Sequence, residues 1–102
     1  MISIKYNKKN VIISGHAKYA DYGNDIVCAS VSSIVYTTIN GILNINSNAI
    51  KFEDKKGIKI EILSDDNITS ILITNMIDLL MDLAMQYPDN IKISKGEWTC
   101  YL

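Results

Sequence analysis

Short runs in which apolar and polar residues alternate are the feature that most restricts the fold of this chain. Four of these runs form two pairs: 1–6 with 11–14, and 50–53 with 58–62. A polar four-residue segment joins the runs of each pair, Asn7–Asn10 in the first and Asp54–Gly57 in the second. Alternation puts the apolar side chains on one face of a strand, and a short turn lets consecutive strands pair antiparallel. The sequence therefore predicts two β-hairpins.

Two longer stretches have the spacing of helices. From residue 25 onward, apolar side chains recur at the intervals of one buried helix side. The residues on that side are Val27, Val31, Ile34, Val35, Thr38 and Ile42. Gly41 marks the expected end of this helix. Ser64–Asn67 supply helix-start residues for a second helix, from Ile68 to about Gln86, which ends before Pro88.

A last alternating segment, Asn90–Ser94, predicts a fifth strand and gives the element order β-β-α-β-β-α-β. With 102 residues, the chain is expected to form one domain over its whole length, 1–102. Lys and Glu alternate in the second hairpin, so one face of the sheet is expected to contact solvent. We therefore expect an α+β fold, a mixed or antiparallel sheet with two helices packed on one face.

The composition argues against several functional classes. The formal net charge is −1 and all ten basic residues are Lys, so no Arg offers the two-pronged contacts typical of phosphate or guanine recognition. We expect no direct binding to nucleic acid. One His and two distant Cys leave a tetrahedral zinc site short of ligands, and no glycine-rich phosphate motif follows a strand. We therefore expect no metal and no cofactor.

The N-terminal segment and the hydropathy pattern bear on location. Residues 1–5 lack the charged region and apolar run of a signal peptide, and no apolar stretch reaches the roughly 18 residues that span a membrane. The chain is thus expected to be cytoplasmic, with no membrane contact. In that compartment Cys28 and Cys100 are expected to be reduced thiols.

The segment from Gly15 to Ser32 contains the one His and one of the two Cys. His16 follows the second predicted strand, and Cys28 lies near the start of the first predicted helix. The thiolate is the nucleophile, and a free thiol with a pKa of about 8.5 is mostly protonated at neutral pH. A helix dipole and a neighbouring imidazole both favour the thiolate. By residue type alone, a small buried Cys28 and a hydrogen-bonded His16 remain the simpler interpretation.

Two neighbours of Cys28 have both a structural and a chemical interpretation. Asp25 is placed to cap the first helix, or else its carboxylate orients His16 and stabilises the imidazolium. Ser32 lies one turn beyond Cys28, where its hydroxyl either bonds the thiol or the imidazole, or donates back to the Cys28 carbonyl. At about 100° per residue, Cys28 and Ser32 fall on the flank of the buried stripe, between the buried and polar sides.

Residues 17–24 show no regular period and are expected to form a loop. Tyr19 and Tyr22 either line a substrate groove or pack on their own scaffold. Gly23 permits backbone angles that other residues avoid, so we expect this loop to close over a bound substrate.

Several residues of this segment form one string: Gly15-His16-Ala17, Tyr19, Tyr22-Gly23, Asp25-Ile26-Val27-Cys28-Ala29 and Val31-Ser32. The string resembles the ribosomal-processing cysteine protease family (Prp), and the chain length and element order agree with that family from end to end. Ser30 departs from the family, which more often has Ala there. The resemblance implies Cys28 as the nucleophile and His16 as its base. It also implies an important acidic residue at Asp25, without settling its role.

The resemblance further implies a cysteine endopeptidase that removes the N-terminal extension of a large-subunit ribosomal protein (bL27 type) during ribosome maturation. Nothing in the composition or spacing points to that substrate. An oxyanion hole is expected from backbone amides at the helix start, including that of Cys28. Two alternatives stay open, a thiol-based redox sensor and a non-catalytic ribosome-associated binding module.

The second helix predicts a homodimer, and the resemblance to a family that forms dimers implies the same. Apolar residues cover more than half of its helical wheel, which exceeds what one buried stripe needs. Ile73 and Ile77 are expected on the outer part of this arc. The alternative is that the sheet of the same subunit buries them.

Overall fold

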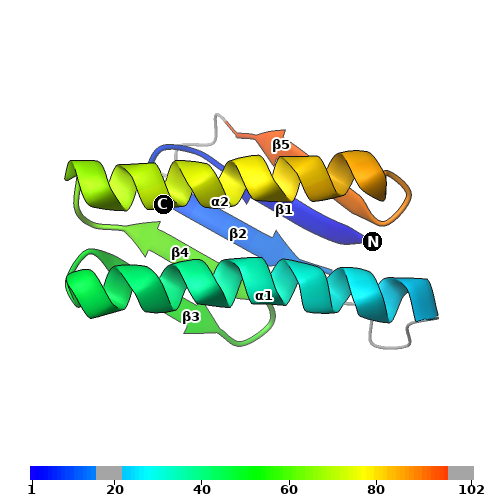
Figure 1. The fold of residues 1–102 in the computed structure, drawn as a ribbon, viewed down its shortest axis with the longest axis horizontal. Coiled ribbons are helices and arrows are strands. Elements are labelled where there is room, and N and C mark those ends of the chain that lie inside the picture. The colour runs from blue at the N-terminus through cyan, green and yellow to red at the C-terminus, as the bar shows by residue number, and fades with distance from the viewer. Residues whose placement is uncertain (16–21, 97–102) are drawn as a thin grey trace.

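The structure, a computed structural model, describes residues 1–15 and 22–96, and for residues 22–25 it describes the backbone alone. The described elements follow one another in the predicted order (Figure 1): β1 (Ile2–Tyr6), β2 (Asn10–Ser14), α1 (Tyr22–Ile45), β3 (Ile50–Asp54), β4 (Ile58–Ile62), α2 (Asn67–Gln86) and β5 (Ile91–Lys95). The predicted α+β order β-β-α-β-β-α-β is confirmed.

The strands form one mixed sheet in the order β3-β4-β2-β1-β5. Both predicted hairpins are present, since β1 pairs antiparallel with β2 and β3 pairs antiparallel with β4. Strands β2 and β4 join the hairpins, also antiparallel, whereas β5 pairs parallel with β1. It follows that β2 and β3 run in one direction and that β4 and β5 share the other. Each of these same-direction pairs is connected by a helix, as a crossover requires.

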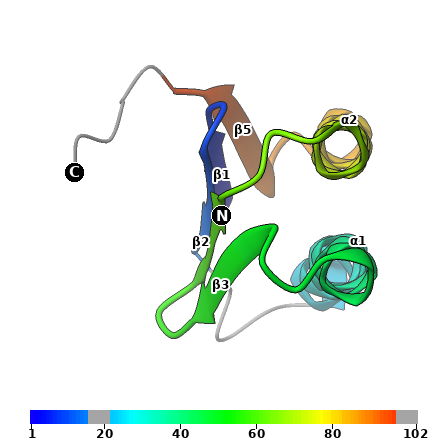
Figure 2. The same cartoon turned by 90° about the vertical axis from the view of Figure 1, so that its left-hand side faces the viewer.

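Both helices cover the same face of the sheet (Figure 2). The buried strand residues lie on this face, and two of them, Ile4 and Ile13, are 0% and 1% exposed. On the opposite face the register sets Lys51 across from Glu61, and both side chains are exposed. Opposite charges across a strand pair stabilise the pairing modestly. The expected solvent-facing side of the sheet is confirmed.

The core lies between the inner face of the sheet and the stripes of the two helices. Helix α1 contributes side chains that are at most 3% exposed: Val27, Val31, Val35, Ile39 and Ile42. The predicted stripe is confirmed except that Ile39 belongs to it, while Ile34 and Thr38 are half-buried. Because full burial of one Val or Ile contributes about 1.5–3 kcal/mol, this contact between helix and sheet is a main source of stability.

Helix α1 is longer than the sequence predicts at both ends. It begins at Tyr22, three residues before the predicted start, and this end extends past the strands (Figure 1). A turn beyond the sheet needs no apolar spacing, and extending an existing helix costs little, so periodicity does not reveal it. Gly41 lies inside the helix, which ends at Ile45, where the Asn46 N–H bonds the Ile42 carbonyl.

Helix α2 begins after Asp66, whose carboxylate accepts a hydrogen bond from the Thr69 N–H at 3.3 Å. The Ser64 hydroxyl donates to the same carboxylate. The hydrogen bonds from Thr69 and Ser64 lower the pKa of Asp66. The helix ends at Gln86, before Pro88 as predicted.

The apolar arc of α2 differs from the prediction. Ile73 and Ile77, expected on its outer part, are buried, with 8% and 6% of their surface exposed. The exposed apolar residues of this helix are instead Ile68, Ile71, Leu79, Met81 and Met85. The wheel shows that apolar residues occur on several sides of α2, but it does not show which side faces the sheet.

Both helices are long and apolar enough to cross a membrane by length and composition. Segments Ile26–Ile45 and Asn67–Gln86 each have a mean hydropathy of 1.6, and 28% of each window is buried. By this measure the expectation that no stretch reaches that length is wrong, because Ser and Thr are nearly neutral in hydropathy and the many Ile, Leu, Val and Met residues outweigh the few Asn and Asp. Such helices are weak evidence for a membrane span, since a helix packed on a sheet has a similar composition.

Replacing Gly41 by Ala should stabilise the fold. The residue is helical, and a Cβ placed there meets no atom within 4 Å. Alanine also restricts the unfolded chain more than glycine does, so the free energy of unfolding should rise by about 0.5–1 kcal/mol. Urea unfolding followed by circular dichroism measures the change. Gly57→Ala is the control and should destabilise, because Gly57 has a φ of +148°. A lower unfolding free energy for Gly41→Ala would contradict an open helical position.

The Asp66 cap should make part of the stability depend on pH. A carboxyl whose pKa is lower in the folded chain adds stability above its unfolded-state pKa, and that contribution is lost as pH falls through the lowered folded pKa. Asp66→Asn keeps an acceptor oxygen but does not titrate. Its melting temperature should therefore fall less than that of the wild type below about pH 4. Thermal melts at a series of pH values test this, and equal losses in the two proteins would contradict it.

Candidate active site

Cys28 lies on α1, half-buried at the margin of the core. It is a free cysteine whose side chain packs against the buried cluster. Because α1 begins at Tyr22, Cys28 is the seventh residue of the helix, which corrects the prediction of a position at the helix start. The helix dipole stabilises a thiolate less at this position, because its effect weakens beyond the first turn. The Cys28 N–H also pairs within the helix, so the expected oxyanion hole cannot include it in this arrangement.

Cys28, Ser32 and Tyr36 follow one another at one-turn intervals on the same flank of α1. All three are half-buried, so the predicted flank position of Cys28 and Ser32 is confirmed. Ser30 and Thr38 each donate to a carbonyl one turn back at 2.9 Å. Among the described residues, Ser32 makes no such bond. Its hydroxyl is therefore not occupied by the Cys28 carbonyl.

The strand that leads to His16 ends in a close backbone contact. Ile12 and Ser14 share the sheet face that points away from the helices, since Val11 and Ile13, on the other face, belong to the buried core. Gly15 follows with a φ of +86°, and a Cβ at this position would collide with the Met1 carbonyl oxygen. The backbone conformation and this close approach thus explain why position 15 is a glycine, without any contact to a substrate. His16 is the next residue and lies outside the described residues.

The β3–β4 turn lies on the other side of that strand end. Ile13 in β2 pairs with Ile58 in β4. Gly57, just before Ile58, comes so close that a Cβ there would lie 2.6 Å from the Ile13 carbonyl oxygen. Close backbone contacts therefore hold the end of β2 from both neighbouring strands.

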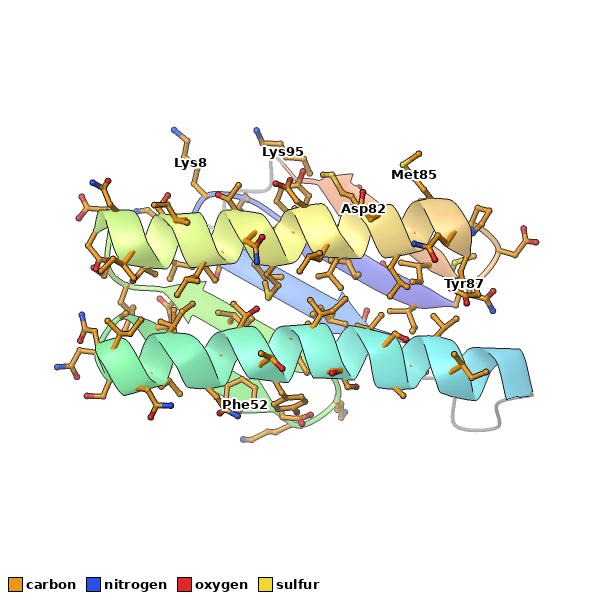
Figure 3. The ribbon with its side chains drawn as sticks, in the orientation of Figure 1. Lys8, Phe52, Asp82, Met85, Tyr87 and Lys95 are labelled. Atoms are coloured by element: carbon orange, nitrogen blue, oxygen red, sulfur yellow. The ribbon has the colours of Figure 1, made fainter. Side chains whose placement is uncertain are left out.

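Tyr36 connects the flank of α1 to the end of β3. Its ring packs edge-on against Phe52, with centroids 5.6 Å apart and planes at 89°, at the edge of the sheet on the side away from α2 (Figure 3). Its hydroxyl donates a hydrogen bond to the Asp54 carboxylate. This bond, and to a smaller extent burial, raise the pKa of Tyr36. No pattern in the sequence indicates this contact, because Tyr36 and Asp54 lie 18 residues apart in different elements.

Two cavities lie at opposite ends of the fold. One of about 350 Å³ is lined by the end of β2 and the β3–β4 hairpin, including Ile12, Ser14 and Lys59. Another, of about 800 Å³, lies between α2 and the β1–β2 turn. Cys28 lines neither cavity. The candidate site is therefore assigned from the chemistry of Cys28 and not from either of these two cavities.

The remaining predicted site residues fall in or beside the gap in the described chain. Ala17 and Tyr19 lie outside the described residues, as does most of the loop that we expected to close over a substrate. Tyr22 and Gly23 belong to α1 and not to a loop, because the helix begins at Tyr22. Asp25 is the fourth residue of that helix, so it is not the N-cap. A carboxylate in the first turn still interacts favourably with the helix dipole.

Cys28 Sγ is the one free thiol among the described residues, which makes it the candidate nucleophile. Within residues 1–15 and 22–96, no three His, Cys, Asp or Glu lie close enough together to hold a metal ion. Cys100, the other thiol, lies outside these residues.

Known proteins are similar to this sequence along most of its length. The family model for cysteine protease Prp matches residues 1–92. The ribosomal processing cysteine protease Prp of Staphylococcus aureus is 31% identical over 90 residues, which cover 83% of this chain and 84% of the relative. The protein of the same name from Mycoplasma genitalium is 26% identical over 101 residues, covering 96% of this chain and 99% of the relative.

Solved structures share the fold. The essential ribosomal processing protease Prp of S. aureus, in complex with a substrate peptide, matches with a TM-score of 0.87 at 22% identity, over 94% of this chain and 100% of that one. A protein from Streptococcus mutans matches with a TM-score of 0.76 at 22% identity, over 92% of this chain and 90% of the other. Together with the family match over residues 1–92, these likenesses show that the chain belongs to the cysteine protease Prp family and is a cysteine protease.

Proposed function

We propose that this protease removes the N-terminal extension of a large-subunit ribosomal protein of the bL27 type during ribosome maturation. Its relatives are named ribosomal processing cysteine proteases, and one was solved with a substrate peptide. The observation that carries the proposal is the position of Cys28, a free thiol half-buried on the flank of α1 within the family-like string. At such a flank a thiol is partly shielded from water and still open to a peptide.

The proposed reaction uses Cys28 as nucleophile and His16 as proton carrier. The thiol proton passes to the His16 imidazole, and Sγ attacks the scissile carbonyl carbon. The new C–S bond produces a tetrahedral oxyanion, which collapses as the C–N bond breaks. The imidazolium then donates its proton to the leaving amine. Water, deprotonated by His16, hydrolyses the thioester and restores the thiol.

Two neighbouring residues are proposed to support this pair. The Ser32 hydroxyl lies on the flank of Cys28 and is not used in a helix back-bond, so it is assigned a hydrogen bond to the thiolate or the imidazole. Asp25 is assigned to the His16 imidazole, since its position inside the first turn removes the N-cap role. The oxyanion needs donors other than the Cys28 amide.

The proposed setting is the cytoplasm, where ribosomal proteins are made. The reaction needs no cofactor, and the proposed partner is the extended ribosomal protein and not nucleic acid or a membrane. The lack of Arg among the ten basic residues supports this, because phosphate recognition favours Arg.

Cys28→Ala should abolish cleavage of the extended ribosomal protein, because it removes the nucleophile. His16→Ala should lower kcat/KM by at least about 10²-fold, the usual loss of a general base. Cleavage assays with mass spectrometry of the new N-terminus measure both effects. If Cys28→Ala still cleaved the substrate, the assignment of Cys28 as the nucleophile would be wrong.

The second thiol gives the matched control. Cys100→Ser should cleave like the wild type, and iodoacetamide should label Cys28 faster than Cys100, because only Cys28 lies in the family-like string. Peroxide oxidation of Cys28 without any cleavage would indicate a redox sensor instead. Full function of Cys28→Ala in cells would indicate a binding module.

We also propose a homodimer with α2 at its interface. Ile71, Leu79 and Met85 are 65%, 43% and 81% exposed on this helix. Met85 projects away from the rest of the fold (Figure 3). Several large apolar side chains exposed along one helix favour its burial against a second copy of the same surface.

Leu79→Lys should convert the dimer to a monomer, because an interface at α2 would have to bury the added charge. Ile45→Lys is the control: Ile45 is 58% exposed at the end of α1, and the dimer mass should not change. Light scattering at micromolar concentration measures the mass. A monomeric wild type would refute the dimer, and a dimeric Leu79→Lys would exclude α2 as its interface.

A further inference from the structure

Tyr36 joins the flank that carries Cys28 to the last residue of β3. It lies eight residues beyond Cys28, about two helical turns. Its hydroxyl donates to Asp54, while its ring packs on Phe52, two residues earlier in β3. Because the ring and the hydroxyl contact different residues of one strand, they fix both the position and the direction of the Tyr36 side chain.

Asp54 is also the point where the β3–β4 turn begins. Within this turn the Lys55 N–H bonds the Gly57 carbonyl at 3.1 Å. Gly57 in turn packs on the backbone of Ile13 and Ser14 at the end of β2. A continuous series of contacts therefore runs from Tyr36 through Asp54 and the turn to the end of β2. His16 follows Ser14 by two residues in the chain.

We propose that Tyr36 and Asp54 are positioning residues, whose hydrogen bond sets the spacing between the helix that carries Cys28 and the strand end that leads to His16. This inference rests on the proposed catalytic pair. Neither residue is assigned a contact with the reacting atoms. A tyrosine hydroxyl is protonated at neutral pH and can donate there, and the hydrogen bond to Asp54 raises the pKa of Tyr36 further.

The effect should appear in catalysis more than in stability. Asp54 is exposed, and polar contacts at the surface contribute little to folding. By contrast, displacing a catalytic group by about 1 Å can lower a rate by about 10²-fold. The bond is therefore better suited to fix a distance than to hold the fold together.

Tyr36→Phe tests the bond alone, because it removes the hydroxyl and keeps the ring on Phe52. It should lower kcat for peptide cleavage by about 10-fold, within the range lost when a catalytic pair is displaced, and leave KM unchanged. Alkylation of Cys28 by iodoacetamide at pH 7 should slow by a similar factor, and its pH profile should move to higher pH. The melting temperature should stay close to that of the wild type. Alkylation needs no peptide substrate, so it tests the positioning separately from proteolysis.

Substitutions at the acceptor complete the test. Asp54→Ala should lower the cleavage rate as much as Tyr36→Phe does. Asp54→Asn should retain part of the rate, because its amide oxygen still accepts a hydrogen bond. The double variant Tyr36→Phe with Asp54→Ala should be no slower than either single variant. Glu53→Gln is the matched control, since this carboxylate lies on the same strand but on the opposite face, and Tyr87→Phe controls for loss of a tyrosine hydroxyl elsewhere. Both controls should behave like the wild type.

Wild-type cleavage and alkylation rates in Tyr36→Phe would overturn the positioning role, and so would additive effects in the double variant. An equal loss of rate in Glu53→Gln would also overturn it, because the effect would then come from charge and not from this bond. If Cys28→Ala still cleaved the substrate, the proposed catalytic pair would fail instead, whatever the result at Tyr36.

Discussion

The packing of two helices on one face of the sheet is the interaction on which the rest of the structure depends. On α1 this contact also determines where the thiol points. Val27 and Val31 lie on the buried side of α1 next to Cys28 and are 0% and 3% exposed, so the helix cannot turn about its axis without exposing buried apolar surface. Cys28 is therefore held at the margin of the core. A flank residue on a rigid helix is positioned more firmly than a residue on a loop.

The end of β2 is held by a different kind of constraint, which comes from the backbone. Gly15 and Gly57 have positive φ, and each brings its backbone too close to another strand for a Cβ. Gly15, beside the proposed base His16, suggests room for a substrate, but the Met1 carbonyl takes this space, as the Ile13 carbonyl does at Gly57. The family-like string thus contains a glycine that the backbone geometry requires, Gly15, and two residues whose side chains are suited to catalysis, His16 and Cys28.

Much of the fold could be predicted because it follows from local patterns. Alternation over five residues identifies a strand, and the apolar stripe identifies the buried side of α1. The errors arose where local pattern carries no information. The first turn of α1 lies past the sheet, so neither the helical position of Tyr22 nor the loss of the cap role at Asp25 left a periodic signal.

Other errors and omissions depend on contacts between distant parts of the chain. Ile73 and Ile77 were placed on the outside of α2, because a wheel with apolar residues on several sides does not show which side meets the sheet. The Tyr36–Asp54 bond joins residues 18 positions apart, and no local rule pairs them. Cys28 was identified correctly as a flank residue because its position relative to Val27 and Val31 is set within a single helix.

The parallel pairing of β1 with β5 has a consequence for the order in which the chain assembles. Ile2 pairs with Ile91, so β1 gains its second neighbour only after residue 91 has been synthesised. The strands β3, β4, β2 and β1 can associate once residue 62 has emerged, and this set includes the strand end beside His16. Until β5 arrives, β1 is an unpaired edge in the nascent chain, a surface prone to pairing with other strands. Docking of β5 covers this edge of β1 and makes β5 the outer strand of the sheet.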